Sequence, residues 1–408
     1  MTGLGTTFDQ AGAAPASSSR AASRAGTRER WRMGLEARAL VLVTAVLMSV
    51  GLAVLFSASA LVAVAADLPG YHYVLRQASG AAVGIVAFAV LAKLDAEMWR
   101  RLAWPAMIVS ILLMIAVLFT PTVNGSSRHL FGGSLQPSEL AKFAILVWTP
   151  MLLAKKGAAV RRIGKGLMPF AIVIGTLSLL AVQEPDYSVA MMFCLLTAVL
   201  LFVGGARIGH FVLFGALGLL LVGIQLSQSS YVRERIRSFV AGEQGESLNR
   251  STSADQQYQS FVAVGSGGLI GVGFGQGNQQ RGWLPLAQSD FIGSIVGEEF
   301  GFFGLAGITV LYALYGWLGF RIARNARSPF LTLVAVGLTF STVFTAFIHL
   351  GVVIGLLPNT GLTLPFVSYG RSNLLLTLAM TGILVNIGSD RERVYGVSAT
   401  DPSVAPVS

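Results

Sequence analysis

The sequence contains little charge. Only 12% of its 408 residues are Asp, Glu, Lys or Arg, whereas 54% are hydrophobic, and soluble domains carry roughly twice that share of charge. Apolar runs of about 20 residues, long enough to span the hydrocarbon of a bilayer, recur along the chain. Because a backbone in lipid must satisfy its own hydrogen bonds, such runs form helices. We therefore predict an all-α polytopic membrane protein with about ten transmembrane helices.

Cysteine and histidine are also scarce. Cys194 is the only cysteine, so an internal disulfide and a cysteine-ligated metal site are excluded. The four histidines are scattered over different segments, which disfavours a metal cluster, and no metal site is predicted. The glycine-rich run 265–277 lacks the spacing of a dinucleotide fingerprint, although its backbone N–H groups can form an anion-binding nest.

The basic residues are distributed asymmetrically. The predicted spans are residues 39–65, 73–93, 102–120, 138–154, 167–183, 187–204, 208–226, 290–320, 328–350 and 370–388. Most of the 29 basic residues lie at the two termini and on alternate connections between these spans. The positive-inside rule then places both termini in the cytoplasm. We thus attribute the net charge of +10 to the orientation of the chain in the membrane and not to nucleic-acid binding.

The segments outside the spans fall into three parts. Residues 1–38 are rich in Ala, Ser, Gly and Arg and are predicted to be a disordered cytoplasmic tail. Residues 389–408 form a cytoplasmic C-terminal tail. The long loop 227–289 faces outward. Its later part, 258–277, is too short and too broken by glycine to span, so we expect it to lie at the interface or to enter the membrane and return.

Four polar motifs stand at the outward ends of predicted spans. They are "NGSSRHLFGGSLQPSELAKF" (124–143), "QEPDYSVAM" (183–191), "LAQSDFIGSIVGEEFG" (286–301) and "GLLPNTGLTLPFVSYGRSN" (355–373). Their common location on one side of the membrane predicts a functional site there.

Asp290 heads the third motif. On a continuous helix, Gly293, Gly297 and Gly301 would form a ladder of small residues for close helix packing. Asp290 then lies at the mouth of that contact. It either caps the helix, as Ser289 also can, or acts as a general base.

Seven further acidic and basic positions in these motifs carry alternatives. Glu298, about 12 Å deeper by helical rise, and Glu299 are candidates for buried salt bridges or supporting acids. Glu139 and Lys142, spaced i, i+3, form an ion pair, or Lys142 and Arg128 offer positive charge to an anionic headgroup. Glu184 and Asp186 serve the turn at Pro185, or they bind a cation or orient a basic partner. Ser368 supplies a hydrogen-bonding hydroxyl at the interface.

Together, the motifs resemble those of the SEDS family (shape, elongation, division and sporulation), which includes FtsW, RodA and SpoVE. The resemblance covers residues 40–390, and "GLTLP" is more similar to the division branch, FtsW. It implies a peptidoglycan glycosyltransferase of the bacterial cytoplasmic (inner) membrane that polymerises lipid II during septal synthesis in cell division. It also implies a class B penicillin-binding protein and other divisome proteins as partners.

The family's essential aspartate corresponds to Asp290. Lipid II is a disaccharide-pentapeptide on an undecaprenyl pyrophosphate. The expected role of Asp290 is to deprotonate the 4-hydroxyl of the acceptor sugar as the pyrophosphate of the donor leaves. Cationic help for the leaving group would come from Arg128, Lys142 or the cluster Arg233, Arg235 and Arg237, and a divalent cation is a further candidate without a dedicated ligand set.

The sequence departs from the family pattern in three places. Arg371 and Asn373 replace a glycine and a serine, His349 replaces an asparagine, and Tyr187–Ser188 replaces Leu-Gly or Phe-Gly. The alternatives to a division polymerase are a lipid II flippase or other transporter, an elongation-type polymerase, and a scaffold that only docks division proteins.

Overall fold

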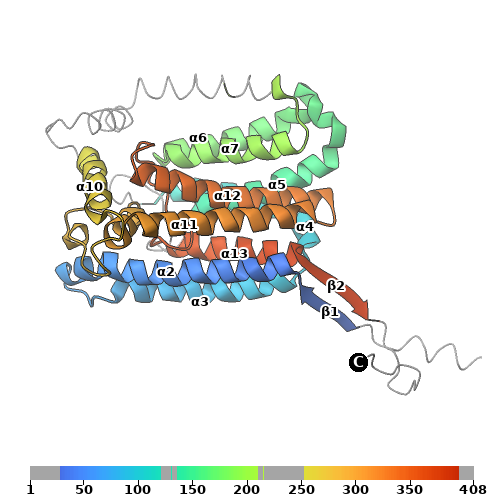
Figure 1. The fold of residues 1–408 in the computed structure, drawn as a ribbon. Coiled ribbons are helices and arrows are strands. Elements are labelled where there is room, and N and C mark those ends of the chain that lie inside the picture. The colour runs from blue at the N-terminus through green and yellow to red at the C-terminus, as the bar shows by residue number, and fades with distance from the viewer. Residues whose placement is uncertain (1–27, 121–129, 131–135, 210–214, 216–251, 395–408) are drawn as a thin grey trace, which may run out of the picture. The chain divides into compact units, whose positions relative to one another are not determined.

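The computed structural model describes residues 28–120, 130, 136–209, 215 and 252–394. Residues 33–388 belong to one compact unit, a bundle of long helices that run side by side (Figure 1). The other unit contains most of β1 (Arg28–Met33) and β2 (Ser389–Val394), which pair as a two-stranded sheet. Residues 28–33 of the predicted tail thus form a strand, and the first helix begins at Leu35.

The described helices follow the predicted spans closely. They are α2 (Leu35–Ala65), α3 (His72–Lys93), η2 (Ala96–Met98), α4 (Trp99–Val117), α5 (Pro137–Lys156), η3 (Gly157–Arg161), η4 (Ile163–Leu167), α6 (Met168–Gln183), α7 (Tyr187–Val203), α10 (Thr252–Gly267), η5 (Gln279–Arg281), α11 (Ile292–Arg324), α12 (Pro329–Val353) and α13 (Arg371–Ile387). Six of the described helices are long and apolar enough to cross a membrane, and α6, α7 and α13 are shorter apolar helices. The predicted span 208–226 lies almost wholly outside the described residues.

Small residues set the distance between α3 and α13. A side chain at Gly84 would meet Leu378 and the backbone of Leu375, and one at Gly382 would meet the backbone of Phe88. Without Cβ atoms at these positions the two backbones approach closely. In a membrane the hydrophobic effect does not drive helices together, so such close van der Waals packing stabilises their contact.

Helix α11 is not continuous, contrary to the prediction. Gly301 has φ 64° and ψ −157°, a conformation that interrupts the helix and that glycine adopts without a steric penalty. The predicted ladder is therefore divided: Gly293 faces Val353 and His349 of α12, and Gly297 faces Val264 of α10.

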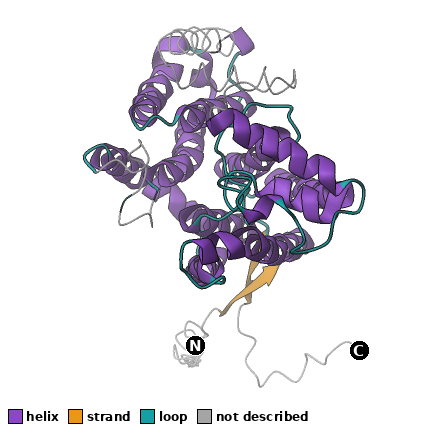
Figure 2. Ribbon diagram, turned by 90° about the vertical axis from the view of Figure 1, so that its left-hand side faces the viewer, coloured by secondary structure: helices purple, strands orange, loops and turns teal. Residues whose placement is uncertain are grey.

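The break at Gly301 is filled by the glycine-rich segment after α10. Val272 and Gly273 donate backbone N–H groups to the carbonyls of Glu298 and Glu299, at 3.0 and 3.1 Å. In return, Phe302 donates to the carbonyl of Gly268 at 2.9 Å. Residues 268–273 thus pair with the backbone of α11 exactly where its own ladder is interrupted. Figure 2 views the bundle from the end at which α10 lies, with the loops in teal among helices seen end-on.

Candidate active site at the start of helix α11

Asp290 lies in a tight turn just before α11. Its backbone N–H donates to the carbonyl of Leu286 at 3.1 Å, and its side chain is partly exposed. The N-cap position of α11 is Phe291, which has no side-chain capping bond. The N-cap is therefore neither Ser289 nor Asp290.

The loop 354–370 covers Asp290. Its Gly361 has φ 69°, and a Cβ atom built there would lie 3.9 Å from Oδ2 of Asp290. Two hydrogen bonds fasten this loop to the turn: the Ser368 hydroxyl donates to the carbonyl of Ser289 at 2.6 Å, and the N–H of Tyr369 donates to the carbonyl of Gln288 at 2.9 Å. The third and fourth polar motifs therefore meet, as predicted, around Asp290.

Ser368 is occupied by contacts inside the protein. Besides donating to Ser289, its hydroxyl accepts the N–H of Leu364 at 2.8 Å, and the residue is only 5% exposed. The sequence also made Ser368 a candidate substrate-binding residue, and that role stays a prediction. In the described residues its hydroxyl connects the loop 354–370 to the turn before α11.

Gln77 of α3 is a site residue that the sequence did not reveal. It is buried, its amide nitrogen donates to the carbonyl of Ser368 at 3.0 Å, and its amide oxygen accepts the N–H of Gly370 at 3.1 Å. A lone glutamine in an apolar span was the only available signal, and its partners lie 291 and 293 positions away.

The second motif also reaches this loop. The Ser188 hydroxyl donates to the carbonyl of Thr360 at 2.7 Å, next to Gly361. In the same motif, Asp186 is the N-cap of α7 and accepts the N–H of Val189 at 3.3 Å, which confirms the turn interpretation for that residue. Glu184 is buried in the same turn.

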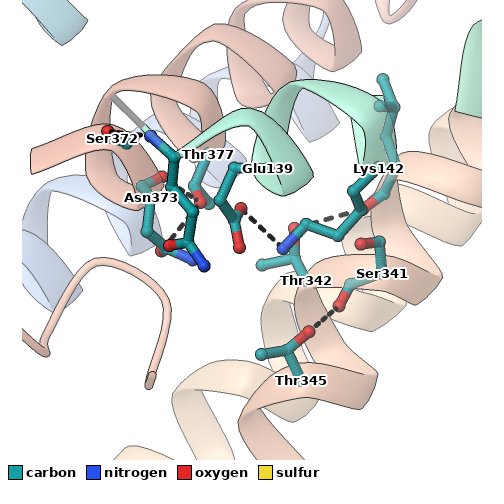
Figure 3. A network of polar contacts seen from close by, with 10 residues as sticks. Glu139, Lys142, Ser341, Thr342, Thr345, Ser372, Asn373 and Thr377 are labelled. Carbon is teal, nitrogen blue, oxygen red and sulfur yellow. Dashed lines mark hydrogen bonds and ion pairs between the residues drawn. The ribbon is translucent and has the colours of Figure 1, made fainter. Parts of the chain in front are cut away.

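The first motif contributes an ion pair at the start of α5. Lys142 Nζ lies 2.7 Å from Glu139 Oε2, and both residues are 7% exposed, so the predicted pairing is confirmed. Figure 3 shows the two side chains pointing toward each other among polar residues of α12 and α13, namely Ser341, Thr342, Thr345, Asn373 and Thr377. The N–H of Gln136 donates to Ser372 at 3.3 Å, which joins this motif to the fourth.

Glu298 and Glu299 have buried carboxyl groups that accept hydrogen bonds from the backbone. Glu298 accepts the N–H groups of Asn278, at 2.7 Å, and Gln279, at 3.2 and 3.3 Å to its two oxygens. Glu299 accepts the N–H of Gly275 at 3.1 Å and the hydroxyl of Ser57. In the described part of the chain neither glutamate has an ion-pair partner, so the expected salt bridge was wrong. Within the glycine-rich run 265–277, only Gly275 donates a backbone N–H group to one of these carboxyl groups; the other two donors, Asn278 and Gln279, directly follow the run.

The remaining predicted cations cannot be placed. Arg128, Arg233, Arg235 and Arg237 lie outside the described residues. Within residues that are described, no group of three or more His, Cys, Asp or Glu side chains has an arrangement suited to a metal ion.

The fold and this site define a polytopic helical membrane protein with a partly exposed aspartate in the turn before α11. The family model described as "Cell cycle protein", FTSW_RODA_SPOVE, matches residues 37–393. The chain belongs to this family.

Named relatives are similar over nearly their whole length. A probable peptidoglycan glycosyltransferase FtsW of Trichlorobacter lovleyi is 34% identical over 89% of this chain and 95% of the relative. Stage V sporulation protein E of Bacillus subtilis is 36% identical over 85% of this chain and 95% of the relative.

Solved structures share the fold. A chain from a peptidoglycan synthase complex that coordinates polymerization and crosslinking matches with a TM-score of 0.71 and 27% identity, over 86% of this chain and 96% of that one. The rod shape determining protein RodA of Thermus thermophilus matches with a TM-score of 0.63 and 26% identity, over 86% of this chain and 95% of that one.

Proposed function

We propose that this protein polymerises lipid II into β-1,4 glycan strands for the division septum, with Asp290 as the general base. It is a peptidoglycan glycosyltransferase, which is also the activity in the name of its FtsW relative from Trichlorobacter lovleyi, similar over 89% of this chain. The observation that supports the assignment to Asp290 is its position. It is a partly exposed carboxylate in a turn to which the loop 354–370 is fastened.

The chemistry requires one base and one stabilised leaving group. The acceptor 4-hydroxyl oxygen attacks the anomeric carbon of the donor, the bond from that carbon to the pyrophosphate oxygen breaks, and the hydroxyl proton passes to Asp290. A single displacement inverts the configuration at the anomeric carbon of the donor. A base whose backbone is held on both sides is already placed for proton transfer, which lowers the entropic part of the barrier.

Positive charge near the pyrophosphate would stabilise its departure. The charge of Lys142 is balanced by Glu139, so the ion pair suits polar recognition of the substrate better than net neutralisation of a phosphate. Arg128 and the cluster Arg233, Arg235 and Arg237 remain the candidates for that neutralisation.

We place the site on the outer face of the bacterial cytoplasmic membrane, with both termini in the cytoplasm, on the distribution of basic residues. A class B penicillin-binding protein and other divisome proteins are the proposed partners. The fold shared with a chain of a peptidoglycan synthase complex supports the first of these.

The test is polymerisation of purified lipid II by the full-length protein, alone and with a class B transpeptidase. Asp290→Asn should abolish glycan chains while the protein remains folded. Asp67→Asn is the matched control, because Asp67 is an exposed acid on the predicted outward connection 66–72, and asparagine tolerates its φ of 57°.

Normal chains from Asp290→Asn would overturn the assignment. If the wild-type protein makes no polymer but moves lipid II across the membrane of vesicles, a flippase would be favoured. If it shows neither activity, a scaffold would be favoured.

A further inference from the structure

His349 has a buried imidazole that the reaction chemistry does not use. It lies in the last two turns of α12 and is 1% exposed. Both ring nitrogens have partners in other parts of the chain: Nδ1 lies 2.8 Å from the carbonyl oxygen of Leu362, and Nε2 lies 3.3 Å from the backbone nitrogen of Gly293. A buried ring with both nitrogens engaged is held in a single orientation.

The partners determine the protonation state. The backbone N–H of Gly293 can only donate, so Nε2 must be the acceptor and the ring proton lies on Nδ1, where it is donated to Leu362. The ring is therefore neutral in this arrangement. The Gly293 N–H belongs to the first turn of α11, where backbone donors have no partner within the helix.

The two partners belong to the two segments that meet at Asp290. Gly293 is three residues after Asp290, and Leu362 directly follows Gly361, the residue whose position faces the Asp290 carboxylate. The two helices are close here: a Cβ at position 293 would lie 3.1 Å from the Val353 side chain and 3.4 Å from the imidazole ring. One side chain thus connects the first turn of α11, which directly follows the turn of Asp290, to the loop 354–370 at Leu362.

We propose that His349 is a positioning residue for Asp290, which sets the distance between its carboxylate and the loop at Gly361 through these two hydrogen bonds. This rests on the proposed role of Asp290 as the base. A base displaced by about 1 Å loses on the order of a hundredfold in rate. The effect should therefore appear in kcat and leave KM nearly unchanged.

The two bonds can be removed separately. Asparagine places its amide nitrogen near the position of Nδ1, so His349→Asn retains the donor to Leu362. Glutamine places its amide oxygen near the position of Nε2, so His349→Gln retains the acceptor for Gly293. His349→Leu has a similar volume and retains neither bond.

The experiment measures kcat and KM for lipid II polymerisation by the full-length purified variants, normalised to folded protein. His349→Leu should lower kcat about tenfold to a hundredfold with KM within about twofold. His349→Asn should stay within about threefold of wild type because it keeps the shorter bond, and His349→Gln should be intermediate. Thr44→Val is the control: it removes a buried hydroxyl whose bond to Leu40 stays within α2, and it should leave kcat unchanged.

Three results would overturn the inference while the base assignment stands. They are a wild-type kcat for His349→Leu, a loss in that variant fully explained by less folded protein, and an asparagine variant as slow as the leucine variant. Polymerisation by Asp290→Asn would instead refute the proposed function, whatever the His349 variants show.

Discussion

Asp290 and the glutamates Glu298 and Glu299 belong to one sequence motif but lie in opposite environments. Asp290 is partly exposed in a turn before α11. The glutamates are each 1% exposed and accept backbone N–H groups from residues 275–279. The hydrogen bonds of the glutamates are made inside the protein. In the proposed function, the chemical role therefore belongs to the partly exposed Asp290, and the two buried glutamates organise the backbone of residues 275–279.

The largest expected effect is on activity. Asp290→Asn keeps the size of the side chain and removes its basicity, so the polymerisation rate should fall about a hundredfold or more, since general-base catalysis contributes 10²–10⁴-fold. The free energy of unfolding should stay within about 0.5 kcal/mol of wild type, as is usual for a site that is not fully buried. An Asp290→Asn protein that is destabilised but still active would contradict this expectation, because it would give Asp290 the structural role assigned here to Glu298 and Glu299.

The buried ion pair at the start of α5 tests how a carboxylate is compensated by a cation. Lys142→Met should lower the free energy of unfolding by about 3–5 kcal/mol, because it leaves Glu139 buried without its counter-charge. The double variant Glu139→Gln/Lys142→Met should recover most of that loss. Thermal unfolding in detergent measures both, and an equally unstable double variant would contradict the expectation.

Glu298→Ala tests compensation by backbone donors. It leaves the N–H groups of Asn278 and Gln279 without their acceptor, which should cost about 2–3 kcal/mol of unfolding free energy. Glu298→Gln keeps an oxygen acceptor and should cost less. Hydrogen exchange of residues 275–280 should accelerate in the alanine variant, and unchanged exchange would show that these amides do not depend on Glu298.

The exposed pair Arg321–Glu36 should show the smallest effect. Its atoms are 2.9 Å apart, but the two side chains are 41% and 24% exposed, so solvent screens the attraction. Glu36→Gln should change the free energy of unfolding by less than about 1 kcal/mol. If Glu36→Gln lowered the free energy of unfolding as much as Lys142→Met, burial would not explain the difference expected between the two ion pairs.

Much of the site follows from local sequence pattern. The positions of the helices follow from apolar runs of membrane length, and the Glu139–Lys142 pair follows from its i, i+3 spacing on one helix. The grouping of polar motifs at one end of the bundle follows from alternating topology. These features depend on residues that are near one another in the chain, so one sequence is enough to predict them.

The break in α11 was not predictable in the same way. A ladder of glycines at four-residue intervals is typical of a continuous packing helix, yet Gly301 leaves the helical conformation because residues 268–273 supply the backbone partners there. The same packing brings Ser57 of α2 to Glu299. Local pattern carries no information about which distant segment will approach.

By itself, then, the sequence determined the class of protein and the order of its spans, because hydrophobic length and charge distribution act locally, and the family resemblance made Asp290 the proposed base. Only the tertiary structure decided which polar groups connect the segments around that aspartate. Gln77 and His349 gain their roles from carbonyls and amides brought beside them by folding, and a buried polar group in an apolar span gains its hydrogen bonds only when that partner arrives.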